Sequence, residues 1–260
     1  MEITDFTASL ERDGHLLADA AERAGADAPV PTCPEWRVRD LLSHTGLVHR
    51  WATDFVARGL QQPSRPPEAP DLPDEQLADW LRDGCRTLVR ALRSAPADLS
   101  CWTFLPAPSP LAFWARRQAH ETAVHRADAE AALGVGITAA APAFAVDGID
   151  ELLVGMQARE RSTMRTESPK TLLIRATGAP GVPDAAWSVR LSDAPPRAER
   201  IPSAPAPDDT AASGAAAADC VIEGPAPDLY LALWNRRSLD GITLTGDTGL
   251  ARLWQERSGI

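Results

Sequence analysis

The sequence has very little lysine, few cysteines and no long apolar run. Lys170 is the only lysine among 26 basic residues, a skew that we attribute to the codon usage of a GC-rich genome rather than to arginine chemistry. The four cysteines, Cys33, Cys85, Cys101 and Cys220, are scattered and form no C-x-x-C pair. This spacing argues against a disulfide framework and against a structural zinc knuckle, so we expect free thiols.

Other absences bear on location and partners. No apolar stretch is long enough to cross a bilayer. The first residues, MEITDFTASLERDGHLL, lack a basic segment followed by an apolar core, so we expect no signal peptide. The net charge of −10 argues against binding to nucleic acid or to an anionic membrane. We therefore predict a cytoplasmic protein that has neither of these partners.

The first half of the chain has the pattern of a four-helix bundle. A proline turn, TCPEW, precedes the second predicted helix, and the five-proline stretch QQPSRPPEAPDLP forms an extended connection to the third. Apolar residues recur at helical spacing in four segments, 5–24, 36–60, 74–94 and 111–133. Four such segments predict a bundle over residues 1–140.

The second half, residues 141–260, changes character. Residues 142–161 predict a helix, and residues 193–218 are poor in large apolar side chains and predict a mobile loop. Short β-branched or alternating runs, bounded by Gly, Pro or Asp, predict strands at 171–178, 186–193, 218–224 and 241–247, with helices at 227–237 and 248–257. This mixture predicts a small α+β domain.

The stretch HETAVH contains three residues that can bind a metal: His120, Glu121 and His125. It resembles the H-E-x-x-H helix of zinc proteases, but the second histidine comes one place late. On an α-helix His120 and His125 lie roughly 140° apart, whereas Glu121 and His125 are four residues apart and share a face. Glu121 and His125 are therefore the candidate pair, and a third ligand must come from another segment.

His44 is the histidine that best supplies the third ligand. It lies within an apolar stripe of the predicted helix 36–60, where a lone imidazole needs a partner. Cofactor sites in bundles are built from inward-facing side chains on facing helices. Two histidines and one carboxylate, His44, Glu121 and His125, suit Zn²⁺ or another borderline divalent ion with open positions. His49 and His120 are predicted to lie at the surface or just outside the ligand shell.

Two stretches, VPTCPEWRVRDLLSHTGLVHRWA and RRQAHETAVHRADAEAALG, resemble the mycothiol-dependent maleylpyruvate isomerase family, and LYLALWNRRSLDGITLTGD is a weaker match. The resemblance covers the chain nearly end to end. It implies a DinB-like four-helix bundle at 1–140 and a small sterol-carrier-like α+β domain at 141–260. The family's metal ligands fall on His44, Glu121 and His125. One departure is Arg37, which stands where many relatives have Thr or Ser and weakens the helix cap.

The resemblance also implies a chemistry. A zinc ion lowers the pKa of a bound thiol and holds it as thiolate at neutral pH. The thiol would be mycothiol, the low-molecular-weight thiol of actinobacteria, and it would attack an electrophilic small molecule. An isomerase would then expel the thiol, whereas a thiol S-transferase would release the conjugate. We expect a monomer or weak homodimer with mycothiol and the electrophile as partners; the family is broad and leaves the substrate open.

Further residues carry secondary hypotheses. The family implies an arginine from the second domain, and Arg236 and Arg237 are the candidate catalytic residues because arginine recognises carboxylates in bidentate fashion. A cap at the end of a helix is their alternative role. Asp128, one turn beyond His125, could orient that imidazole or lie on the surface. Cys33 is expected to be buried and inert.

Two other classes of function remain open at this point. One is a non-catalytic binder of an apolar small molecule. The other is a metal-dependent hydrolase that activates water without mycothiol, for which the sequence offers no obvious general base.

Overall fold

The computed structural model describes residues 1–69, 71–203 and 218–259. They divide into two compact units, Met1–Thr138 and Ala139–Ile260. The first contains four helices and the second a sheet with helices, so the predicted mixed α and α+β class is confirmed. That the two units correspond to a DinB-like bundle and a sterol-carrier-like domain, with a boundary at residue 140, stays a prediction.

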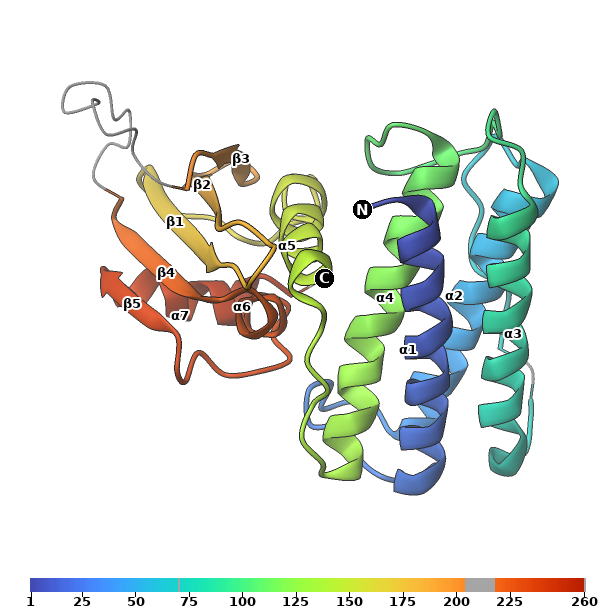
Figure 1. Ribbon diagram of the computed structural model, residues 1–260. Helices are drawn as coiled ribbons and strands as arrows, with labels where there is room; N and C mark the ends of the chain where they lie inside the picture. Colours follow the sequence, from blue (N-terminus) through green and yellow to red (C-terminus); the bar gives the residue numbers. More distant parts are fainter. Residues whose placement is uncertain (70, 204–217, 260) are drawn as a thin grey trace. The chain divides into compact units, whose positions relative to one another are not determined.

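The first unit is a bundle of α1 (Ile3–Ala24), α2 (Val38–Arg58), α3 (Asp74–Ser94) and α4 (Pro110–Leu133) (Figure 1). Helices α2 and α3 run in the same direction, because Gly46 lies against Trp80 and Arg50 lies against Gly84. The proline-rich connection between them therefore returns the chain to the end of the bundle where α2 began (Figure 1). This topology brings α2 and α4 together as antiparallel neighbours.

Local signals set the ends of the two helices that carry the predicted ligands. Helix α4 begins at Ser109, whose side chain accepts a hydrogen bond from the backbone of Ala112, and ends at Gly134 with a positive φ. Helix α2 begins at Arg37, whose side chain makes no capping bond, as expected. The carboxylate of Asp40 accepts from the Arg37 backbone N–H at 2.8 Å instead.

Helix α4 is covered by neighbours on nearly every side. Its buried polar residues are Arg117, Gln118, His120, Thr122, His125, Arg126, Asp128 and Glu130. Buried polar groups need hydrogen-bond or ion-pair partners, so α4 packs through polar contacts as well as apolar ones.

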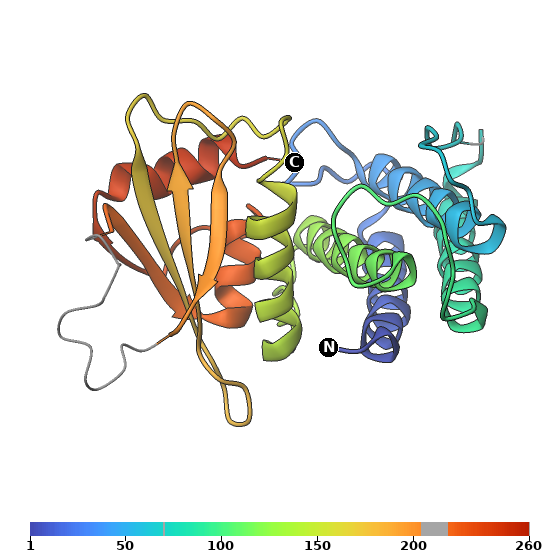
Figure 2. The ribbon, with the colours of Figure 1, turned by 90° about the horizontal axis from the view of Figure 1, so that it is seen from above.

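The second unit begins with α5 (Pro142–Asp150), which continues directly into a π-helical turn, η1 (Glu151–Met156). Five strands follow in the spatial order β3-β2-β1-β4-β5. The central strands β1 (Lys170–Thr177) and β4 (Cys220–Pro225) pair in parallel, and all other pairs are antiparallel. The other elements are β2 (Ala185–Leu191), β3 (Arg197–Ile201), β5 (Thr243–Gly246), α6 (Ala226–Leu233) and α7 (Thr248–Arg257). Helices α6 and α7 cross one face of this sheet (Figure 2).

Three expectations about this unit need correction. Part of the predicted mobile loop 193–218 is an edge strand, since Arg197–Ile201 pairs antiparallel with β2; residues 204–217 lie outside the described residues. The predicted helix 142–161 ends at Met156, and its last part is π-helical. The predicted helix 227–237 ends at Leu233.

None of the helices within the described ranges has the length and apolar character needed to span a bilayer.

Candidate metal centre

The side chains of His44 on α2 and of Glu121 and His125 on α4 converge. Glu121 Oε1 lies 3.3 Å from His44 Nε2 and 3.3 Å from His125 Nε2, and the three ligand atoms all lie within 4.8 Å of one another. A zinc ion with bonds of about 2.0–2.1 Å and tetrahedral angles separates two ligand atoms by about 3.3–3.4 Å. Two edges of the tetrahedron are therefore in place, and the donor set fits zinc or a similar ion.

The side chains of the three candidate ligands differ in how much of each is exposed to solvent. The side chain of His44 is 38% exposed, that of Glu121 is 23% exposed and that of His125 is 8% exposed. His44 was expected inside an apolar face, but more than a third of its side chain is exposed. An ion held by these three side chains could therefore be reached by a small molecule from the His44 side.

Asp128 fixes the orientation of the deepest ligand. Its Oδ2 lies 2.8 Å from His125 Nδ1, so Nδ1 donates to Asp128 and Nε2 is the nitrogen that faces Glu121 and that can bind an ion once its own proton is lost. Thr32 donates to the other oxygen of Asp128 at 2.5 Å, and the thiol of Cys33 lies 3.8 Å from Oδ2. The role considered for Asp128 from sequence, orienting a ligand imidazole, is the one that its position supports.

The turn before α2 covers one side of the two imidazoles. The ring of Trp36 stacks on that of His125 with centroids 5.8 Å apart, and it lies 4.9 Å from the ring of His44. Backbone hydrogen bonds between Val30 and Trp36 and between Trp36 and Cys33 hold the turn closed. The TCPEW motif therefore serves the centre directly, in addition to starting a helix.

Charge within the centre is set by burial and by close partners. Burial alone would raise the pKa of Glu121, but hydrogen bonds from His125 and His44 and the charges of His125 and Arg117 hold that pKa well below its usual value. Burial alone would lower the pKa of His125, but its hydrogen bonds to Asp128 and Glu121 raise it to about 9. In the metal-free protein His125 is therefore protonated at neutral pH, and an incoming ion must displace that proton.

Two histidines that were expected near the surface or around the ligands are both fully buried. His49 lies on α2 with Nε2 2.9 Å from the hydroxyl of Thr122, and burial lowers its pKa to about 3. His120 packs edge-on against Phe6 of α1, with centroids 5.9 Å apart. Neither belongs to the converging trio, which agrees with the helical geometry but not with a surface position.

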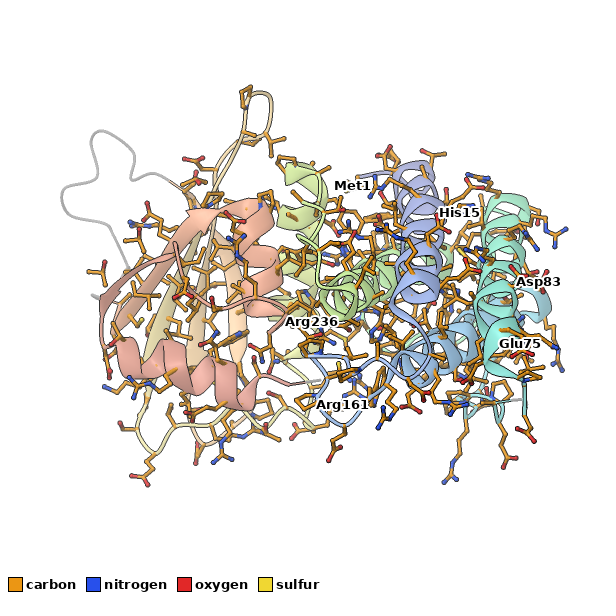
Figure 3. The ribbon with its side chains drawn as sticks, turned by 90° about the horizontal axis from the view of Figure 1, so that it is seen from below. Met1, His15, Glu75, Asp83, Arg161 and Arg236 are labelled. Atoms are coloured by element: carbon orange, nitrogen blue, oxygen red, sulfur yellow. The ribbon has the colours of Figure 1, made fainter. Side chains whose placement is uncertain are left out.

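The candidate catalytic arginines, Arg236 and Arg237, lie in the second unit just after the end of α6 at Leu233; Figure 3 labels Arg236. The guanidinium of Arg236 donates to the carbonyl oxygen of Trp234 at 2.8 Å, which is a helix-end contact. Arg237 forms an ion pair with Asp228. Their proposed contact with substrate stays a prediction.

Sequence reasoning missed Arg117, which binds the second oxygen of Glu121 through Nη2 at 3.0 Å. The signal was available, because arginine and glutamate four residues apart on a helix face one another. Trp36 was predicted to be the first residue of the helix 36–60 and to be a core residue, but α2 begins at Val38 and Trp36 belongs to the turn before it. No periodicity argument places an irregular segment over a site, so its stacking on the imidazoles could not be predicted.

Comparisons with known proteins extend these observations. Residues 7–130 match the family model described as the mycothiol maleylpyruvate isomerase N-terminal domain, and residues 143–253 match the MDMPI C-terminal domain. A search of curated proteins finds no significant match.

Two solved structures share the fold: one of a mycothiol-dependent maleylpyruvate isomerase and one of a histidine-to-alanine variant of such an enzyme. Each is 13% identical in sequence, with a TM-score of 0.59 over 94% of this chain and 93% of the other. Together the two domain models cover nearly the whole sequence in the family's order. The chain belongs to the mycothiol-dependent maleylpyruvate isomerase family.

Proposed function

We propose that this protein is a metal-dependent enzyme that uses mycothiol as a nucleophile toward an electrophilic small molecule, as an isomerase or as a thiol S-transferase. The observation that carries the proposal is the convergence of His44, Glu121 and His125, with two of their three separations equal to the edge of a zinc tetrahedron. Membership of the family supplies the thiol, and three protein ligands leave a fourth position for an external group.

A bound zinc ion, or a similar divalent ion, would lower the pKa of a thiol so that it is present as thiolate at neutral pH. Residues around the three ligands would orient them for binding the ion. Asp128 holds His125 in the tautomer that offers Nε2, and Trp36 packs against the imidazoles of both ligand histidines. Exposure of His44 leaves a route for mycothiol and for the electrophile.

The same geometry makes a water-activating hydrolase the weaker proposal. A hydrolase needs a general base near the attacked water. Of the two carboxylates at the centre, Glu121 is required as a ligand and Asp128 is engaged by His125 and Thr32. Neither is placed to accept a proton from water.

For the second unit we propose that Arg236 or Arg237 binds an anionic group of the substrate or of mycothiol. The support is the family's use of an arginine in this domain and the bidentate chemistry of guanidinium groups. Arginine-to-lysine variants at the two positions would separate them, because lysine keeps the charge but loses the fork. The expected result is a raised KM in one variant alone.

The test of the metal assignment is elemental analysis of protein that was never exposed to chelator. We expect about one divalent ion per chain, with zinc predominant. His44→Ala and His125→Ala should abolish metal binding. His120→Ala is the matched control, since it removes a neighbouring imidazole that lies outside the trio, and it should retain the ion. Equal loss in all three variants would show that the ligand assignment is wrong.

A further inference from the structure

The two oxygens of Glu121 have different surroundings. Oε1 lies 3.3 Å from the ligand nitrogens of both His44 and His125, so it faces the position of the ion. Oε2 lies 3.0 Å from Nη2 of Arg117, whose side chain is 3% exposed. Arg117 stands one helical turn before Glu121 on α4, where an i,i+4 pair is in natural contact. One oxygen of the carboxylate therefore faces the metal position, and the other accepts a hydrogen bond from Arg117.

This division matters because a carboxylate can bind a metal through one oxygen or through both. A chelating glutamate would occupy two positions and, with the two histidines, complete a four-coordinate shell. No position would then remain for an external thiol. A glutamate that binds through Oε1 alone leaves the fourth position open.

The positive charge of Arg117 does not by itself explain its place beside a metal ligand. A positive group one carboxylate away from a divalent cation repels that cation, so it weakens metal binding. The guanidinium does offer a directional hydrogen bond to a charged oxygen, which is stronger and shorter than a neutral one. Arg117 has other interactions as well.

We propose that Arg117 is a positioning residue that restricts Glu121 to binding through one oxygen and thereby keeps a coordination position open for an external thiol. The proposal rests on the proposed metal-dependent function and assigns a task that the three ligands cannot perform themselves. Its subject is the number of ligand atoms around the ion, so it is tested by spectroscopy.

Cobalt substitution reports the coordination number directly. Four-coordinate cobalt absorbs visible light strongly, whereas five- and six-coordinate cobalt absorbs weakly. Wild-type protein and Arg117→Met should both be loaded with Co²⁺ and compared at equal metal content. We expect the visible band of Arg117→Met to change in position but to stay intense, because the freed Oε2 would take the fourth position and the ion would remain four-coordinate. The variant's apparent dissociation constant for a small thiol should rise by about tenfold or more, the lower end of the effect of losing an outer-shell partner.

Two further variants separate positioning from charge and from folding. Arg117→Lys keeps the charge and a donor, so its spectrum should lie closer to that of the wild type. Arg116→Met is the matched control, since it removes the same charge about 100° away on the helix, and its spectrum should be unchanged. Should Arg117→Met fail to fold, Arg117→Gln takes its place, because a neutral amide loses the charge-assisted hydrogen bond to Oε2. The same change of band position and of thiol affinity is expected, and an unchanged spectrum and thiol affinity would overturn the proposal.

The outcomes distinguish the two proposals. A wild-type protein that takes up no cobalt overturns the metal-dependent function, and the role of Arg117 with it. A wild-type protein that binds cobalt, together with an Arg117→Met variant of unchanged spectrum and thiol affinity, overturns the role of Arg117 alone. Equal changes in Arg116→Met and Arg117→Met would show an effect of net charge and would also overturn it.

Discussion

His49 should make the bundle sensitive to mild acid, and the size of the effect follows from its surroundings. Its Nε2 lies 2.9 Å from the Thr122 hydroxyl, which itself lies 2.8 Å from the carbonyl oxygen of Gln118. A hydroxyl has one proton to donate, so Thr122 donates to the carbonyl and accepts from His49. The proton of the imidazole therefore lies on Nε2. Within the described ranges the buried Nδ1 has no hydrogen-bond partner, which favours the neutral ring because an imidazolium would need an acceptor there.

Burial lowers the pKa of His49 from 6.5 to about 3; the charge of Glu121 opposes this shift, and those of Arg50, His125 and His44 add to it. The unfolded chain takes up a proton near pH 6.5, and the folded chain does so only near pH 3. His49 therefore contributes stability above pH 6.5 that is lost as the pH falls toward 3. At pH 5, about 1.5 units below the unfolded value, the loss is about 2 kcal/mol.

The perturbation is His49→Gln, which keeps an N–H donor for Thr122 and does not titrate. The free energy of unfolding of the full-length protein would be measured at pH 7 and at pH 5, by urea unfolding in the presence of chelator. The helical signal in circular dichroism follows the unfolding. We expect the wild type to lose about 2 kcal/mol more than the variant over this interval. His15→Gln is the matched control, because His15 is an exposed histidine of α1 (Figure 3), and its curve should follow the wild type. Parallel curves for the wild type and His49→Gln would refute the buried neutral imidazole.

Three more predictions concern the centre and the packing around it. Because the pKa of His125 is about 9 in the metal-free protein, zinc binding near pH 7.5 should release about one proton, and zinc affinity should fall as the pH is lowered below 9. Calorimetry in buffers of different ionisation enthalpy measures this release. A binding enthalpy that is the same in all buffers would contradict the prediction. Asp128→Ala should lower zinc affinity by about 10–100-fold in a chelator competition, whereas unchanged affinity would remove its orienting role. Gly14→Ala should destabilise the bundle by about 1–3 kcal/mol, because its Cβ would overlap the sulfur of Cys85, and adding Cys85→Ala should recover part of the loss in urea unfolding.

Periodicity was a good guide where an element has one apolar face and clear end signals. Helix α3 has the predicted bounds, with Pro73 before it and a regular apolar stripe along it. Helix α7 also has the predicted bounds, with Asp247 accepting from Gly249 at its start. Strand β3 was missed because RAERI has no apolar alternation. It is a strand because an edge of β2 is available for pairing, and that edge is created by the fold.

Some features of the candidate site could also be predicted from the sequence, and others could not. The sharing of a face by Glu121 and His125 is a property of one helix and could be predicted from spacing. Proximity of His44 required two facing helices, which the bundle pattern supplied, and the structure brings the three together. The burial of His120 could not be predicted, because α4 is covered on nearly every side and no exposed stripe remains to guide the reasoning. His49 lies on α2 and is buried with its Nε2 against Thr122 of α4, a contact that residue spacing along α2 does not reveal.

The central claim is that the His44, Glu121 and His125 centre holds an ion that accepts the sulfur of mycothiol, and cobalt-substituted protein tests it most directly. A thiolate ligand adds a charge-transfer band in the near ultraviolet. The account predicts that the band appears on adding mycothiol at pH 7, is absent with mycothiol disulfide, and is absent in a Glu121→Ala, His125→Ala double variant that retains all four cysteines. A band that persists in the double variant, or a cobalt-loaded wild type that shows no band with mycothiol, would contradict it.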